Sequence, residues 1–281
     1  MMGDFVLFMA APFAGCLVIL AIHAYLGLHI LEREVIFVDL ALAQIAALGA
    51  ALGLLIGYEL DDGMSYLLSL AATLVGAALF ATTRSTQARI PQEATIGIVY
   101  IVSAAAAILV LDHAPHGAEN LKTLLVGQIV WIDWRGVGHI ALVYAVVGAL
   151  HWLLRERFFT ISFREDEARR LGGSLQWWDF TFYASFGFVI TISVPIAGIL
   201  LVFSFLIVPA VCAVLVSERV DVRRRLVISW IVGAVVSAVG CTISFAADLP
   251  TGATIVCTFG TALIAIAVVR GLRAMQRSNP S

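Results

Sequence analysis

Long apolar segments follow one another along almost the whole chain, and short polar connections separate them. A helix needs about 20 apolar residues to cross a bilayer. Nine segments reach or approach that length: residues 5–28, 35–57, 64–82, 94–111, 136–154, 178–194, 196–216, 226–246 and 252–270. The sixth and seventh meet at Pro195, which predicts either a turn between two helices or a kink in one long helix. The pattern predicts an all-α integral membrane protein, a polytopic bundle of eight to nine transmembrane helices.

The composition agrees with a membrane location. Hydrophobic residues make up 61% of the 281 residues and charged residues only 13%, whereas soluble proteins carry about 25% charged residues. One water-soluble core cannot bury so much apolar surface. The short alternating segments typical of a transmembrane β-barrel are not seen in the sequence.

The basic residues are distributed unevenly between the connections. All of them except Lys122 and Arg135 fall on one side of the predicted bundle, and the positive-inside rule places that side in the cytoplasm. With nine spans, the N-terminus is then outside and the C-terminus cytoplasmic. We expect a single transmembrane domain over residues 1–281, with its longest cytoplasmic loop at 155–178 and a short cytoplasmic tail at 271–281.

The 155–178 loop contains "SFREDEARRLGG", a pattern typical of a short helix. Ser162 can cap its start, and Gly172 and Gly173 predict its end. The order of its charges complements the helix dipole, with three acids and then two bases: Glu165, Asp166, Glu167, Arg169 and Arg170. Such a helix is either ordinary loop structure or a docking element for a soluble partner.

Signatures of catalysis are missing from the sequence. The stretch "GAENLKT" before Leu124 departs from the phosphate-binding pattern GxxxxGK[ST], so any ATP must be bound by a separate subunit. His113 and His116, in an outer loop with acidic neighbours, offer donors that suit divalent transition metals. The same residues are common in ordinary loops, which is the simpler interpretation. Nothing indicates a nucleic-acid partner.

The stretch "FVDLALAQIAALGAALG", residues 37–53, is apolar apart from Asp39 and Gln44. These two are five positions apart, so they point about 140° from each other on a helix. An ionised carboxylate at the middle of a membrane helix costs about 3 kcal/mol, and His23 on the preceding span lies at a similar predicted depth. We expect His23 to approach Asp39, or Asp39 to face a wet pore. The small residues Gly49, Gly53 and Gly57 predict close helix packing.

Four stretches, in order, resemble one family: the membrane-spanning subunits of ABC importers for zinc, manganese and related metals. They are "EATIGIVYIVSAAAAILVL", "FREDEARRLG", "AGILLVFSFLIVPAVCAVL" and "DLPTGATIV". They are similar to the family's acidic-x-x-x-Ile-Gly segment, its Phe-Asp-x-Glu-x-Ala-x-x-x-Gly loop, its Val-Gly-x-Leu-Leu-Val…Pro-Ala-x-x-Ala stretch and its Leu-Pro-Ser/Thr-Gly turn. The similarity extends from about Leu26 to the last span.

The resemblance implies a permease subunit that moves a divalent transition metal, of the zinc or manganese class, into the cytoplasm by alternating access. It implies a homodimeric pore in a bacterial inner membrane, cytoplasmic ABC ATPase subunits and an extracytoplasmic metal-binding protein. The metal is then the substrate, and the chain is not itself an enzyme and binds no cofactor. The element that contacts the ATPase would comprise Phe163, Glu165, Asp166, Glu167, Ala168, Arg169 and Gly172.

The second span departs from the family pattern. Members usually carry Gly-Asp-x-x-x-His there, with a glycine five residues after the histidine. Here Gly49 is in register, Gln44 occupies the histidine position and Leu40 the aspartate position, with Asp39 one residue earlier. Asp39 and Gln44, together with His23, are the candidate substrate-pathway residues, and the first two are candidate metal ligands. The alternative function is an ion-coupled secondary transporter that uses Asp39 as an intramembrane carboxylate.

Overall fold

A computed structural model describes residues 2–84, 90–114, 116–171, 174–217 and 221–278. Within these ranges every regular element is a helix, so the predicted all-α class is confirmed. The elements are α1 (Met2–Glu32), α2 (Val38–Leu55), α3 (Gly63–Thr83), α4 (Gln92–Leu111), α5 (Gly117–Val126), the short 3₁₀ helix η1 (Ile129–Trp131), α6 (Trp134–Leu153), α7 (Arg155–Phe163), α8 (Glu165–Arg169), α9 (Ser174–Val216), α10 (Val222–Ala247) and α11 (Thr251–Ser278).

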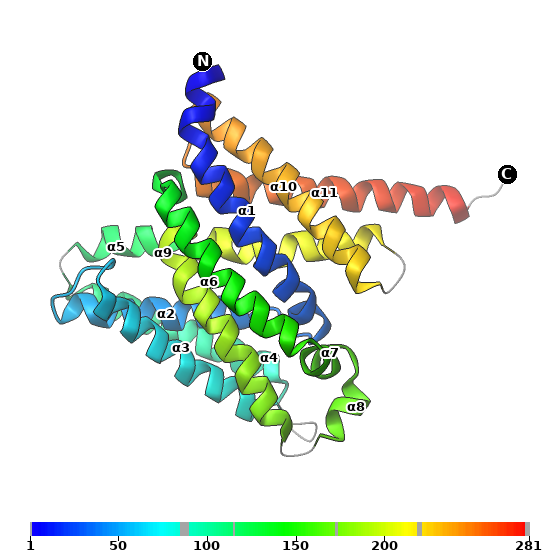
Figure 1. Cartoon of the computed structure of the whole chain (residues 1–281), viewed down its shortest axis with the longest axis horizontal. Coiled ribbons are helices and arrows are strands. Elements are labelled where there is room, and N and C mark those ends of the chain that lie inside the picture. Colours follow the sequence, from blue (N-terminus) through cyan, green and yellow to red (C-terminus); the bar gives the residue numbers. More distant parts are fainter. Residues whose placement is uncertain (1, 85–89, 115, 172–173, 218–220, 279–281) are drawn as a thin grey trace.

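Eight helices of the described chain are long and apolar enough to cross a membrane: α1, α2, α3, α4, α6, α9, α10 and α11. The longest, α9, has 43 residues but is interrupted at Gly198. A straight helix of that length would measure about 65 Å, roughly twice the hydrocarbon core of a bilayer. Figure 1 shows the two parts of α9 running in different directions. The eight helices therefore supply nine segments of spanning length.

The sequence predicted a turn or a kink at Pro195. The break in α9 lies three residues further on, at Gly198. Gly198 has φ 78° and ψ 156°, a conformation that is essentially limited to glycine. It faces Gly127, also at positive φ, so closely that a Cβ on Gly198 would lie 2.3 Å from the Gly127 nitrogen. The Gln128 N–H donates to the carbonyl of Ile196 at 2.9 Å. This bond satisfies a carbonyl that the interrupted helix leaves free.

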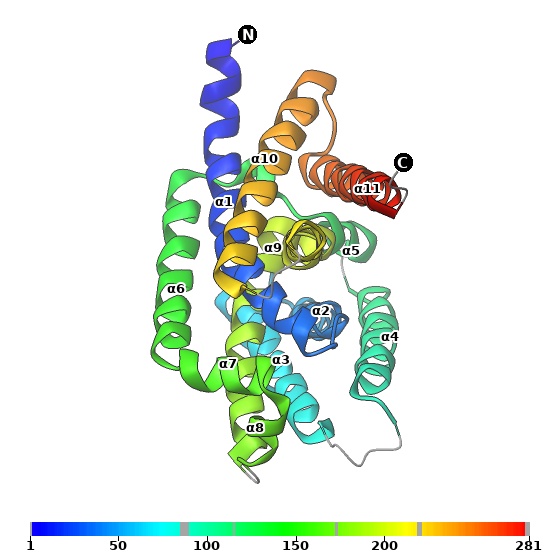
Figure 2. The ribbon, with the colours of Figure 1, turned by 90° about the vertical axis from the view of Figure 1, so that its right-hand side faces the viewer.

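The helix α2 occupies the centre of the bundle and packs against α3, α4 and α9 (Figure 2). In its most apolar window 78% of the residues are buried, against 22% for α4 and α11. A Cβ on Gly49 would lie 2.6 Å from Ser69 Cα of α3, and one on Gly53 would lie 2.5 Å from Ser65 Oγ. The predicted packing role is confirmed for these two glycines. Gly57 instead follows the helix end at φ 97°, with open space around it.

The predicted loop helix is shorter than expected, because residues 155–163 form a separate helix, α7, before the five-residue α8. Ser162 lies inside α7 and does not cap α8. Its hydroxyl is engaged instead with Arg33 and His29, at 2.9 Å from each. The cap prediction was wrong because this tertiary contact occupies the hydroxyl. The predicted stop at Gly172 and Gly173 lies outside the described residues.

Candidate functional site

Asp39 lies in the first turn of α2 and is buried, with 1% of its surface exposed. Neither carboxylate oxygen has a hydrogen-bond partner within the described part of the chain. Gln44, further along the same helix, is also buried. The central helix thus holds a carboxylate in the protein interior and not against lipid. A buried acid without a partner is energetically costly, which makes Asp39 a functional-site candidate.

His23 does not pair with Asp39. Its Nδ1 lies 2.8 Å from the Ile19 carbonyl oxygen, its Nε2 has no partner in the described ranges, and its ring packs against Tyr144 of α6. The predicted pairing was wrong because the helix ends lie elsewhere than expected. His23 is nine residues from the end of α1 at Glu32, about 14 Å along the axis. Asp39, in contrast, belongs to the first turn of α2.

His113 and His116, in the connection between α4 and α5, are both exposed. His113 Nδ1 lies 3.0 Å from the Leu109 carbonyl oxygen, and His116 adopts a left-handed conformation at the start of α5. No group of three or more His, Cys, Asp or Glu side chains that could hold a metal ion occurs among the residues with described placement. The suggested metal site at His113 and His116 therefore has no third protein ligand there.

The α7–α8 segment combines a buried anchor with exposed charges. Ala168 is fully buried, whereas Asp166 and Glu167 are exposed. The ring of Phe163 lies 5.2 Å from that of His29 on α1, centroid to centroid. The segment thus rests on the bundle through small and aromatic side chains and presents its acids outward. Three members of the predicted contact set are not described, namely the side chains of Glu165 and Arg169, and Gly172.

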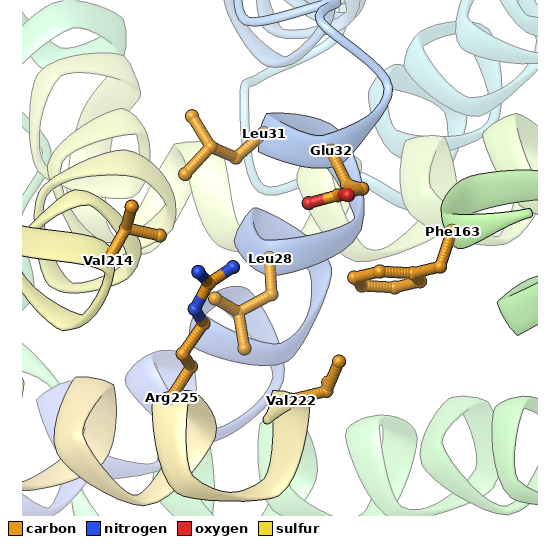
Figure 3. A pocket seen from close by; sticks show the side chains of 7 residues that line it. All are labelled: Leu28, Leu31, Glu32, Phe163, Val214, Val222 and Arg225. Carbon is orange, nitrogen blue, oxygen red and sulfur yellow. The ribbon is translucent and has the colours of Figure 1, made fainter. Parts of the chain in front are cut away.

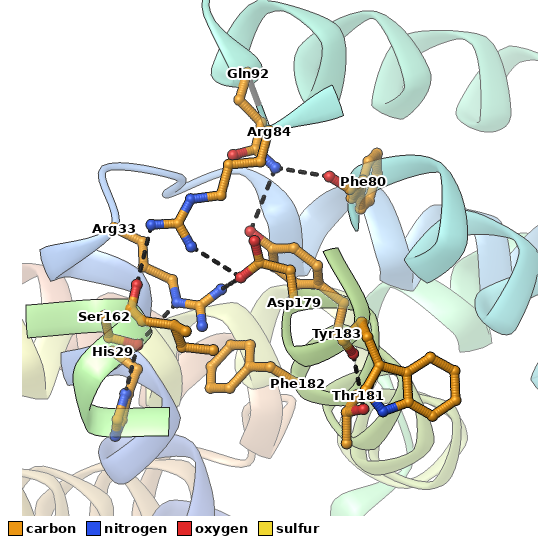
Figure 4. Close-up of polar contacts among 12 residues, drawn as sticks. His29, Arg33, Phe80, Arg84, Gln92, Ser162, Asp179, Thr181, Phe182 and Tyr183 are labelled. Carbon is orange, nitrogen blue, oxygen red and sulfur yellow. Dashed lines mark hydrogen bonds and ion pairs between the residues drawn. The ribbon is translucent and has the colours of Figure 1, made fainter. Parts of the chain in front are cut away.

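A group of buried charges lies beside this segment and was not predicted from the sequence. Asp179, near the start of α9, accepts hydrogen bonds through Oδ1 from Arg33 at 3.0 Å and from Arg84 at 2.8 Å (Figure 4). Arg33 also donates through Nε to the Ser162 hydroxyl of α7, and Arg84 donates to the carbonyl of Ile161. The group therefore joins the ends of α1, α3, α7 and α9. We call Arg33, Arg84 and Asp179 the charged junction.

A small hollow with a volume of about 10 Å³ lies between the ends of α1, α7, α9 and α10 (Figure 3). It is lined by Leu28, Leu31, Glu32, Phe163, Val214, Val222 and Arg225. That volume is about the space of one water molecule, so the hollow is too small for a typical small-molecule site. It shows that Phe163 of the α7–α8 segment borders three membrane helices at once.

A bundle of membrane helices whose central member buries a carboxylate without a partner among the described residues is typical of transporters. Residues 6–270 match the family described as the ABC 3 transport family. The chain belongs to that family and is a permease subunit of an ABC transporter.

Two related proteins and one solved structure illustrate the likeness. The chain is 26% identical over 179 residues to the "Probable iron transport system membrane protein" of Haemophilus influenzae, covering 64% of this chain and 62% of that protein. It is 24% identical over 204 residues to the manganese transport system membrane protein MntC of Listeria monocytogenes, covering 73% and 71%. PsaBC from Streptococcus pneumoniae in complex with Fab has a TM-score of 0.76 over 95% of both chains, at 20% identity, so the fold is shared.

Proposed function

We propose that the chain carries a divalent transition metal into the cytoplasm, by alternating access, as the membrane part of an ABC importer. The family match over residues 6–270 carries this proposal. Relatives named for manganese and for iron transport favour these two metals as substrates. Zinc as a substrate is supported by the sequence resemblance alone. The metal is the substrate, and a partner subunit binds and hydrolyses ATP.

The proposed orientation has nine crossings, an outside N-terminus and a cytoplasmic C-terminus. The break at Gly198 touches the 126–128 connection, and a Cβ on Gly252, at the start of α11, would lie 2.7 Å from the Val126 carbonyl oxygen. These neighbouring connections are poor in basic residues, whereas those at the opposite helix ends are rich in arginine. This arrangement supports a turn of α9 at the outer surface and so favours nine crossings over eight.

Asp39, Gln44 and His23 are the substrate-pathway residues that we propose. Carboxylate and amide oxygens suit Mn²⁺, and imidazole suits iron and zinc. Among the described residues, two buried oxygens of Asp39 and one buried nitrogen of His23 have no hydrogen-bond partner. Since His23 makes no contact with Asp39 among the described residues, these groups would serve a moving ion in succession. Water or the second copy of a homodimer would complete its coordination.

Three partners follow from the proposal, in a bacterial inner membrane. Cytoplasmic ABC ATPase subunits would contact the α7–α8 segment, where Asp166 and Glu167 are exposed. An extracytoplasmic metal-binding protein would deliver the ion to the opposite face. A second copy of this chain would complete the pore, in keeping with the poorly buried α4 and α11.

Uptake of radioactive Mn²⁺ by cells that express the chain with its ATPase and binding protein tests the proposal. We expect uptake that requires ATP hydrolysis, is reduced by excess unlabelled Fe²⁺ or Zn²⁺ if those ions share the pathway, and disappears when residues 165–170 are deleted. Full uptake without the ATPase subunit, or with residues 165–170 deleted, would contradict it. Co-purification of the ATPase with the intact chain, and its loss from the deleted chain, supplies an independent measurement.

The sequence left one alternative function, an ion-coupled secondary transporter, which membership of an ABC transporter family argues against. Its one supporting observation is the buried acid Asp39, because such a group can carry a proton across a membrane. Dissipating the proton gradient with an ionophore while ATP is maintained separates the two functions. Under that treatment a secondary transporter stops, whereas the ABC importer continues.

A further inference from the structure

The charged junction is arranged around a single oxygen. Asp179 Oδ1 accepts from Nη1 of Arg33 and from Nη1 of Arg84, and the Asp179 side chain is fully buried. The Arg33 side chain is 2% exposed and that of Arg84 is 21% exposed. The three residues come from the end of α1, the end of α3 and the first turns of α9, so one carboxylate ties three membrane helices together.

Both arginines hold α7 at the same time. Arg33 donates to the Ser162 hydroxyl at 2.9 Å, and Arg84 donates to the carbonyl of Ile161 at 3.0 Å. The α7 helix leads directly into α8, which begins at Glu165. A displacement of α8 is therefore transmitted to both arginines through α7, a helix of nine residues.

The contacts of the junction are costly to break one at a time. Removing one partner from a buried ion pair leaves a charge without compensation in a medium of low polarity. Arg33 gains a further contact, since its guanidinium lies 4.0 Å from the centre of the Phe182 ring on α9. Arg84 is more exposed, so water can solvate its guanidinium when the bond to Asp179 breaks. We therefore expect the Arg33–Asp179 contact to persist during movement and the Arg84–Asp179 contact to break first.

We infer that the charged junction transmits movement of the α7–α8 segment to α1, α3 and α9. This inference rests on the proposed function, in which a partner ATPase moves α8. Arg33, Arg84 and Asp179 are positioning residues, because they act through helices and not on the substrate. Without the junction, α8 would follow the ATPase while the membrane helices stayed behind, and ATP would be hydrolysed without transport.

The test uses the complete complex of this chain, its ATPase and its binding protein in liposomes, with Mn²⁺ as the probe. Uptake and ATP hydrolysis are measured in the same preparation, and their ratio is the readout. We expect Asp179→Asn to keep the ATPase bound but to lower the ratio by about twofold to thirtyfold. Arg33→Gln should have a similar effect and Arg84→Gln a smaller one. Asp179→Glu, which keeps the charge, should restore much of the ratio.

Asp61→Asn is the matched control, because Asp61 is exposed in the turn before α3, at the opposite end of that helix from Arg84. Its ratio should equal that of the unmodified chain. An assembled Asp179→Asn complex with an unchanged ratio would overturn the inference. If that variant does not fold, Ser162→Ala replaces it, since it removes the Arg33 contact to α7 without changing a charge, and it should also lower the ratio. An unmodified chain that recruits no ATPase contradicts the proposed function instead.

Discussion

The substitution Gly198→Ala tests whether the chain really turns at this residue. The conformation of Gly198, φ 78° and ψ 156°, costs an alanine about 1–3 kcal/mol in backbone strain. The new Cβ would also lie 2.3 Å from the Gly127 nitrogen and from the Val126 carbonyl carbon. These are backbone atoms that cannot rotate away, so overpacking adds about 1–3 kcal/mol. We therefore expect the folded state to lose about 2–6 kcal/mol.

The measurement is thermal unfolding of the purified chain in detergent, followed by tryptophan fluorescence and by the fraction that remains monodisperse. Reversible unfolding in mixed micelles with increasing SDS converts the shift into a free energy. Gly148→Ala is the control: Gly148 lies within α6, and no group of the described residues lies within 4 Å of its added Cβ. That change should be neutral or stabilise the chain by up to about 1 kcal/mol. A Gly198→Ala chain as stable as this control would refute the turn at Gly198.

Three further predictions concern the centre of the bundle and the α7–α8 segment. Asp39→Asn should raise the melting temperature by removing a buried acid without partners, while lowering Mn²⁺ uptake; unchanged uptake would exclude Asp39 from the pathway. Gly49→Ala should lose about 1–3 kcal/mol, measured by unfolding in SDS, because the Cβ meets the α3 backbone at Ser69. Ala168→Leu should reduce co-purification of the ATPase, since Ala168 is fully buried and a larger side chain must displace α8. Full recovery of the ATPase would show that the position of α8 against the bundle is not needed for ATPase binding.

The helical architecture could be predicted because it depends on segment length and apolar content. Each of the nine predicted segments overlaps a helix or one part of α9. The ends of the helices were less predictable, because they depend on local contacts that periodicity does not report. The extension of α1 to Glu32 and the start of α2 at Val38 both place His23 and Asp39 further apart than the sequence predicted. Likewise, Pro195 is the stronger helix breaker in sequence, but the chain turns at Gly198, where the facing backbone of Gly127 leaves no room for a Cβ.

The charged junction could not be predicted because it depends on which helix ends meet. In the sequence, Arg33 and Arg84 look like ordinary basic residues of cytoplasmic connections. A signal was nevertheless present at Asp179, an acid directly after Trp177 and Trp178 at the beginning of a long apolar segment. A charge at the edge of such a segment needs shielding, and arginines at the same membrane face are the available partners. The same rule also identified Asp39, whose burial the structure supports.

Asp39 and Asp179 are both buried acids in the described part of the chain, but their surroundings differ. Asp179 receives two arginine donors at the edge of the bundle, so its charge is compensated and its effect is to hold helices together. Asp39 has no donor at all in the described ranges and lies on the most buried spanning helix. Packing alone would be better served by an apolar residue there, because a buried unpaired acid only destabilises. A transported cation would supply the missing positive charge, which makes loss of uptake together with gain of stability the expected signature of Asp39→Asn.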